Sequence, residues 1–89
     1  MGREINDHVG ARIRGRRREL GLTQGELGRL VGLAHQTIHK FEGGASRICA
    51  EHLWRLSIAL DVPVGHFFEG LESKPSAGQA RRTMPRKVT

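Results

Sequence analysis

Apolar side chains recur three or four residues apart through most of this chain, a spacing typical of amphipathic helices. The first such segment places Val9, Ile13 and Leu20 on one face and ends at the glycine that follows. Asn6 or Asp7 is a suitable N-cap for it, because either side chain can accept a hydrogen bond from a free amide of the first turn. We therefore predict a first helix that begins at one of these two residues.

The second predicted helix begins with a capping box, the sequence Thr-Gln-Gly-Glu at residues 23–26. In a capping box the Thr23 hydroxyl accepts from the Glu26 amide, and the Glu26 carboxylate accepts from the Thr23 amide. Gly32 then ends the helix, because glycine adopts the left-handed conformation of a helix C-terminus at little cost. The side chains expected to be buried on this helix are Leu27, Leu30 and Val31.

A third helix is predicted directly after this turn, with Ile38 and Phe41 facing the core and the glycine pair at 43–44 ending it. Ala34 stands where a side-chain cap is expected. Alanine has no acceptor oxygen, and an N-cap side chain typically contributes about 1 kcal/mol. We therefore expect the first turn of this helix to fray in the free protein.

Two further helices complete the predicted fold. The first spans residues 50–60 and is broken by Asp-Val-Pro at 61–63. Pro63 suits the first turn of a short fifth helix, which extends to about Phe68. Because no segment has the alternating pattern of a strand, the predicted class is all-α with five helices. The side chains expected in the core from these two helices are Leu53, Leu56, Ala59, Leu60, Val64, Phe67 and Phe68.

The chain has 89 residues, enough for one small domain. It carries 15 Lys and Arg against 9 Asp and Glu, a net charge of +6, which favours a polyanionic partner. Residues 1–20 hold six basic and three acidic residues, residues 21–71 hold four and five, and residues 72–89 hold five and one. We predict one folded domain over residues 5–70 and a basic tail over residues 71–89 that is disordered when free.

Composition and missing motifs exclude several classes of protein. The single cysteine, Cys49, cannot form an intramolecular disulfide and is expected to be a small buried residue. No run of about 18 apolar residues and no signal-peptide core is found, so we expect a soluble, cytoplasmic protein without membrane contact. No pair of nucleophile and base is found, so no enzyme is expected. His35 and His39 have the spacing of a helical metal pair, but no third ligand fits, and we expect neither metal nor cofactor.

The spacing of several residues carries a resemblance to a known family. These residues are Thr23-Gln24, Gly28, Gly32, Ile38 and Phe41-Glu42. Through them the chain resembles the Xre-type, lambda-repressor-like helix-turn-helix family, over roughly Val9 to Phe68. The resemblance implies a five-helix DNA-binding domain whose third helix enters the major groove. It also implies that Gly28 lets the two helices of the motif cross closely.

The outward face of the third helix is what remains once the core positions are removed. The resemblance implies that His35, Gln36 and Lys40 reach base edges, with His39 on the same face. Gln can bind adenine N6 and N7 together, and Lys can donate to guanine O6 or N7. The resemblance further implies that Arg17 pairs with Glu42 while facing a phosphate. The implied phosphate contacts are Gln24, Thr37, Arg17, Ser46 and Arg47.

These features predict that the protein is a sequence-specific transcriptional regulator. We expect it to act as a repressor by occupying double-stranded DNA. One recognition helix reads few base pairs, so we expect a homodimer on a palindromic operator. Trp54 and Ile58 lie off the main apolar stripe of their helix. They are either a dimer contact or peripheral packing against the first or fifth helix.

Two alternatives remain open. The chain could be an antitoxin that represses its own operon and binds a toxin partner through its tail, or an adaptor that binds protein with the same fold. Several basic residues outside the motif are expected to add phosphate contacts that any DNA sequence satisfies. They are Arg16, Arg17, Arg18, Arg81, Arg82, Arg86 and Lys87.

Overall fold

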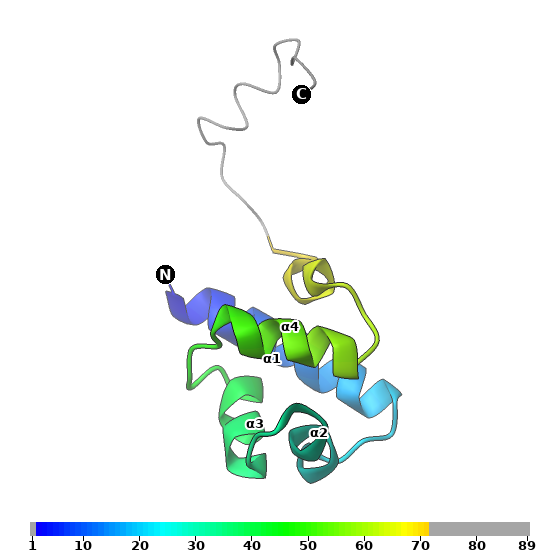
Figure 1. Ribbon diagram of the computed structural model, residues 1–89. Helices are drawn as coiled ribbons and strands as arrows, with labels where there is room; N and C mark the ends of the chain where they lie inside the picture. Colours follow the sequence, from blue (N-terminus) through cyan, green and yellow to red (C-terminus); the bar gives the residue numbers. More distant parts are fainter. Residues whose placement is uncertain (1, 72–89) are drawn as a thin grey trace, which may run out of the picture.

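Four α-helices and one 3-10 helix make up the part of the chain that the structure, a computed structural model, describes: the backbone of residues 2–71 and the side chains of residues 4–71. Except for Leu71, the tail predicted over residues 71–89 lies outside the described residues. The elements are α1 (Gly2–Glu19), α2 (Gln24–Val31), α3 (His35–Glu42), α4 (Ala50–Ala59) and η1 (Val64–Phe68), as Figure 1 shows.

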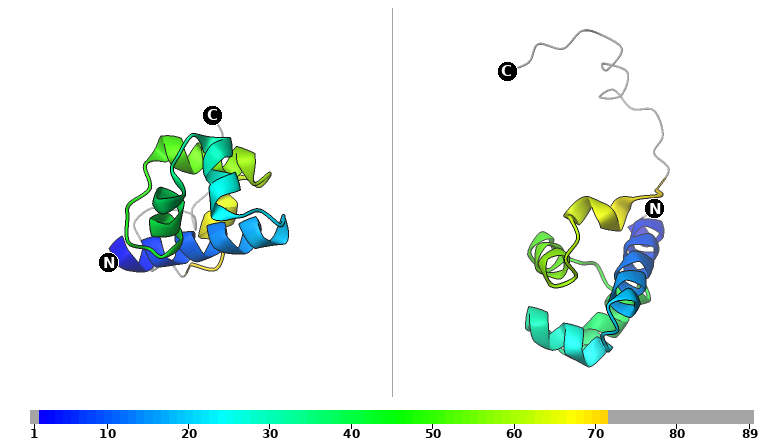
Figure 2. Two further views of the ribbon diagram at one scale, coloured as in Figure 1. Left: turned by 90° about the horizontal axis from the view of Figure 1, so that it is seen from below. Right: turned by 90° about the vertical axis from the view of Figure 1, so that its right-hand side faces the viewer.

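The helices surround one apolar core. Figure 2 (right) shows α1 and α4 on opposite sides, with η1 closing one end and α2 with α3 closing the other. Each helix therefore buries one stripe of apolar residues against the others, as amphipathic helices do. The core side chains are Val9, Ile13, Leu27, Val31, Ile38, Phe41, Leu56, Leu60 and Phe67.

The start of α1 differs from the prediction. The helix begins at Gly2, so that Asn6 and Asp7 lie inside it and neither is its N-cap. Glu4 lies in the first turn, where a negative charge interacts favourably with the helix dipole. This interaction stabilises the additional turn before Asn6. A residue that suits an N-cap can therefore lie inside a helix when the preceding turn is stable by itself. Leu20, expected on the buried face, lies just after the helix and is exposed.

The capping box of α2 is confirmed. The Thr23 hydroxyl accepts from the Glu26 amide at 3.0 Å, and the Thr23 amide donates to Glu26 Oε1 at 2.8 Å. The bond from the Thr23 amide is the main cause that lowers the pKa of Glu26, because a hydrogen bond donated to the carboxylate favours its charged form. The turn is also confirmed, since Gly32 has a φ of 76°, a conformation that favours glycine. The prediction for Leu30 was wrong, because its side chain is 62% exposed.

The last element also differs from the prediction. Residues 64–68 form a 3-10 helix, so the fold has four α-helices and one 3-10 turn instead of five α-helices. A 3-10 helix has three residues per turn, which aligns Val64 with Phe67 and turns Phe68 to another face. Phe67 is fully buried, whereas Phe68 is 40% exposed and was wrongly predicted in the core.

Polar side chains of α1 hold the C-terminal part of the domain. Arg12 Nε donates to the His66 carbonyl at 3.0 Å, and Arg12 Nη2 donates to Glu69 Oε1 at the same distance. Arg16 Nε donates to the Leu60 carbonyl at 2.8 Å, at the end of α4. These bonds attach η1 and the end of α4 to α1. Arg16 is therefore engaged within the domain.

Two glycines allow close approach of backbone segments. A Cβ atom on Gly10 would overlap the carbonyl oxygens of Phe41 and Glu42, so α1 meets the end of α3 backbone to backbone. A Cβ atom on Gly28 would overlap the Leu33 carbonyl. The resemblance implied that Gly28 lets α2 and α3 cross closely. The backbone that lies against Gly28 instead belongs to the connection between the two helices.

Candidate nucleic-acid interface

Helix α3 separates a buried face from a polar outer face. Ile38 and Phe41 point into the core and are almost fully buried. On the other side four polar residues are exposed, and Thr37 at their edge is half-buried. Figure 1 shows α3 at the end of the domain away from η1, where no other helix covers this face. The exposed residues of the face, here called the α3 outer face, are His35, Gln36, His39 and Lys40.

The N-terminus of α3 has no side-chain cap. Ala34 occupies the N-cap position with an extended backbone, φ −68° and ψ 152°, and makes no side-chain hydrogen bond. This geometry is the one that a capping serine or threonine adopts, so only the acceptor atom is missing. The first turn therefore lacks a contribution that α2 receives from Thr23.

A buried ion pair fixes the C-terminal end of α3 to α1. Arg17 Nε donates to Glu42 Oε2 at 2.6 Å and Arg17 Nη2 donates to Glu42 Oε1 at 2.9 Å, a bidentate arrangement. A third donor, Arg17 Nη1, bonds the Leu22 carbonyl at 2.8 Å. The two side chains are only 10% and 3% exposed. The hydrogen bonds from Arg17 to Glu42 raise the pKa of Arg17 and outweigh the opposite effect of burial. The predicted pairing is confirmed.

Gln24 extends this ion pair toward the outer face. Its Nε2 atom donates to Glu42 Oε1 at 3.1 Å and lies 3.4 Å from His39 Nδ1. The structure thus brings together three predicted site residues from α1, α2 and α3 around Glu42. The orientation of α3 therefore depends on polar groups of α1 and α2 that bind its own Glu42.

The loop between α3 and α4 holds two more predicted residues. Ser46 is half-buried and Arg47 is exposed, while the adjacent Ile48 packs against the core. Cys49, which follows, is exposed and takes the N-cap position of α4, so the expectation that it is buried was wrong. The loop is therefore attached to the core through one apolar side chain, and Arg47 is left in solvent.

One feature of this region was not predicted from the sequence. A pocket of about 160 Å³ lies between α1, the start of α2 and the end of α3. Arg14 and Arg18 line it beside Arg17, since the three are spaced i, i+3 and i+4 along one face of α1. That spacing was visible in the sequence, but the wall formed by α3 was not.

Comparison with known proteins identifies the fold. The profile of the helix-turn-helix family matches residues 13–67, more than half of the chain. This chain belongs to the Xre-type, lambda-repressor-like helix-turn-helix family. An HTH-type transcriptional regulator of Sinorhizobium medicae is 48% identical over 65 residues, which cover 73% of this chain and 47% of that protein. The chain thus spans about half the length of the curated relatives it matches first.

Solved structures agree with this family assignment. The c2 repressor of Salmonella phage P22, solved in complex with a synthetic operator, is 34% identical with a TM-score of 0.66, covering 70% of this chain and 94% of that one. The restriction-modification controller protein C.AhdI of Aeromonas hydrophila is 28% identical with a TM-score of 0.69, covering 71% of this chain and 96% of that one. Both superpose on the helix-turn-helix domain described above.

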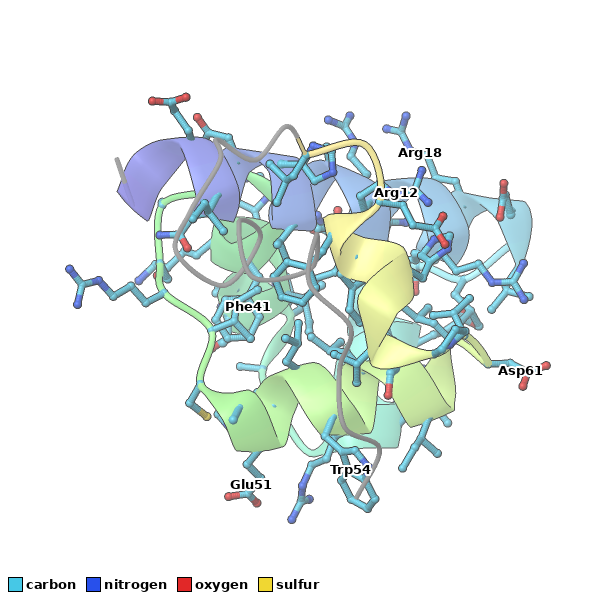
Figure 3. The ribbon with its side chains drawn as sticks, turned by 90° about the horizontal axis from the view of Figure 1, so that it is seen from above. Arg12, Arg18, Phe41, Glu51, Trp54 and Asp61 are labelled. Carbon is cyan, nitrogen blue, oxygen red and sulfur yellow. The ribbon has the colours of Figure 1, made fainter. Side chains whose placement is uncertain are left out.

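The helix-turn-helix domain also has an apolar outer face on α4. Trp54 and Ile58 are each 58% exposed, so packing against α1 or η1 was a wrong alternative. Figure 3 shows Trp54 pointing away from the domain on the α4 side, whereas Arg18 projects from α1 at the opposite edge. Leu30 lines a shallow groove with Ile58, between α2 and α4. Trp54, Ile58 and Leu30 are here called the α4 outer face.

Three further predictions from the sequence concern metal binding, membrane contact and the tail. Among residues 4–71, no three or more His, Cys, Asp or Glu side chains are grouped so that they could hold a metal ion. No helix in the described part of the chain is both long and apolar enough to cross a membrane. The predicted phosphate contacts of the tail lie outside the described residues. They are Arg81, Arg82, Arg86 and Lys87.

Proposed function

We propose that this chain is a non-enzymatic transcriptional regulator that recognises DNA sequence with α3. The observation that carries this proposal is the α3 outer face, four exposed polar side chains on a helix whose other face and C-terminal end are fixed by buried contacts. An α-helix fits the major groove, where donors and acceptors on base edges differ between base pairs. The 34% identity to the P22 c2 repressor, solved with a synthetic operator, supports the same conclusion.

The polar residues of α3 have distinct roles in this proposal. Gln36 binds adenine through N6 and N7, and Lys40 donates to guanine O6 or N7. His35 and His39 complete the base contacts, and each can donate or accept according to its tautomer. Residues around the edge of the helix bind phosphates and set its register on the duplex. These are Gln24, Thr37, Arg17, Ser46 and Arg47.

The protein acts as a repressor and binds as a homodimer in this proposal. The α4 outer face is the dimer surface, because its three large apolar side chains leave water only when another surface covers them. Arg55 and Glu51 form an ion pair at 2.8 Å on the same helix. Around a twofold axis at this face, Arg55 of one copy can pair with Glu51 of the other, so the charges are self-complementary. Such a dimer reads two half-sites about 34 to 36 Å apart on a palindrome.

The division of the chain is part of the same proposal. Residues 5–70 form the DNA-binding unit, since its core includes side chains from α1 through η1. Residues 71–89 add positive charge to this unit. In this arrangement the tail increases affinity for any DNA sequence, whereas α3 discriminates among sequences.

A selection from random duplex oligonucleotides tests the proposal. The wild-type protein is expected to enrich a palindromic consensus, and Lys40→Ala and Gln36→Ala each to weaken binding to that consensus by about 5- to 150-fold, equivalent to about 1 to 3 kcal/mol. Arg29→Ala is the matched control, because it removes an exposed charge from α2 and should leave the consensus unchanged.

Two outcomes would contradict the proposal. Equal, weak binding of the wild type to every sequence would show that α3 does not discriminate among bases. Failure to bind any duplex at low salt would favour a protein-binding adaptor instead.

A further inference from the structure

Three arginines of α1 face the pocket at the end of α3. Arg14, Arg17 and Arg18 lie on one face of α1 and line this pocket of about 160 Å³ together with Gln24 and Glu42. The neighbouring arginine of the sequence, Arg16, is turned away and bonds the Leu60 carbonyl. Of the three consecutive arginines at 16–18, only the second and third therefore belong to the pocket.

The positive charge of the pocket comes from its two outer arginines. Arg17 uses three of its five N–H groups on Glu42 and Leu22, and the charge of Glu42 neutralises its own. Arg14 and Arg18 are exposed, and neither forms an ion pair within the part of the chain that the structure describes. The pocket therefore has two uncompensated guanidinium groups around a neutral, buried pair.

The chemistry of this pocket fits a phosphodiester. Guanidinium groups present planar pairs of N–H donors that match phosphate oxygens and bind them bidentately. The pocket adjoins the end of α3, so a ligand bound there lies at the border of the groove that α3 enters. A phosphate bound at that border would fix the register of α3 without reading the sequence.

We propose that Arg14 and Arg18 together bind one phosphate of the DNA backbone beside Arg17, which also acts as a positioning residue because it holds α3 through Glu42. This inference rests on the proposed DNA-binding function. It assigns Arg14, which no motif indicated, to the interface. It also removes Arg16 from the expected phosphate contacts, because Arg16 is engaged with the end of α4.

Titration of the full chain against its selected duplex at a series of salt concentrations tests the proposal. The logarithm of the binding constant falls with the logarithm of salt concentration by about 0.9 per phosphate contact. Arg14→Ala combined with Arg18→Ala is expected to reduce that slope by about 0.9 and to lower affinity for consensus and scrambled duplexes by the same factor. Arg29→Ala removes another exposed charge and is expected to keep the wild-type slope.

The fold and the ligand are checked separately. Because both side chains are exposed and unpaired in the described structure, the double variant should unfold at the wild-type urea concentration. Arg14→Lys with Arg18→Lys should retain the slope, because the charges remain. A wild-type protein that selects a consensus, with the double alanine variant showing the wild-type slope, would overturn the pocket assignment alone. A wild-type protein that binds no duplex would contradict the proposed function and this inference together.

Discussion

Helices α3 and α4 both pack one apolar face against the core, but their outer faces differ in polarity. The apolar side chains buried beneath them are Ile38 and Phe41 on α3, and Leu56 on α4 with Leu60 at its C-cap. The residues that point outward differ. On α3 they are His, Gln, His and Lys, whereas α4 presents Trp54 and Ile58 beside Leu30 and one exposed Glu–Arg ion pair.

Under the proposed function, one amphipathic pattern serves two kinds of partner. A polar outer face keeps its hydrogen bonds to water until a partner with matching donors and acceptors replaces them, so it is suited to base edges and phosphates. An apolar outer face gains free energy whenever any fitting surface removes it from water. The first face can therefore be selective among sequences, and the second can supply free energy of association.

The largest expected effect comes from releasing α3 from α1. Glu42→Ala leaves the buried Arg17 guanidinium without its partner, so the free energy of unfolding should fall by about 3 to 5 kcal/mol. Urea denaturation measures this loss. Glu51→Ala is the control, because it breaks an exposed pair on α4 and should cost under about 1 kcal/mol. Equal losses in the two variants would mean that the buried pair does not hold α3.

The α4 outer face is disrupted without unfolding the domain by Trp54→Ala or Ile58→Gln. Central apolar side chains of an interface typically contribute at least about 2 kcal/mol, so the dimer dissociation constant should rise about 30-fold or more. Sedimentation of the free protein and of its complex with a palindromic duplex measures the change. Leu20→Ala truncates an exposed apolar residue away from α4 and should leave dimerisation intact. A similar effect from all three variants would argue against this surface.

Ala34→Ser supplies the N-cap side chain that α3 lacks and should stabilise the first turn of its outer face. The extended backbone at this position already suits an N-cap, so a serine hydroxyl can accept from a free amide of the first turn. Stability should increase by about 1 kcal/mol, with slower amide hydrogen exchange at the start of α3. Ala45→Ser places a hydroxyl in the exposed loop and should change neither quantity. If both variants behave alike, the first turn does not need a cap.

The smallest expected effect concerns pH. The folded pKa of Glu26 lies below its ordinary value of 4.5, so its contribution is complete above about pH 4.5 and is lost as the pH falls through the lower folded pKa. The stability difference between wild type and Glu26→Gln should therefore shrink on acidification. Chemical denaturation at neutral and acidic pH measures it, with Glu51→Gln as a control for an exposed carboxylate. A difference independent of pH would mean that the ionised carboxylate does not stabilise the capping box.

Features that depend on near neighbours in the chain could be predicted from the sequence. The capping box at Thr23 needs only residues three apart, and the turn at Gly32 needs only the residue that allows a positive φ. The exposure of Leu30 could not be predicted in this way. Leu27, Leu30 and Val31 share one face of α2, and which of them is covered depends on where α4 lies. The prediction that Phe68 is buried was wrong for a related reason. It assumed an α-helix, whereas these residues form a 3-10 helix with three residues per turn.

In the candidate site, too, features that depend on near neighbours could be predicted from the sequence, whereas features that depend on packing could not. The identity of its outward residues followed from removing the core positions of α3, a local operation. The pairing of Arg17 with Glu42 joins residues 25 apart in the chain, and it came from the family resemblance instead of from spacing. The pocket beside Arg14 depends on how α1 and α3 pack, so no pattern within one helix indicated it.

The backbone contact at Gly10 has a consequence for how binding preference can change. Because α1 meets the end of α3 without an intervening side chain at this point, the axis of α3 is set by main-chain atoms and the buried ion pair. Exchanging the residues at 35, 36, 39 and 40 alters none of these contacts. Evolution or design can therefore vary the outward residues of α3 as a separate module, while the frame that presents them stays the same.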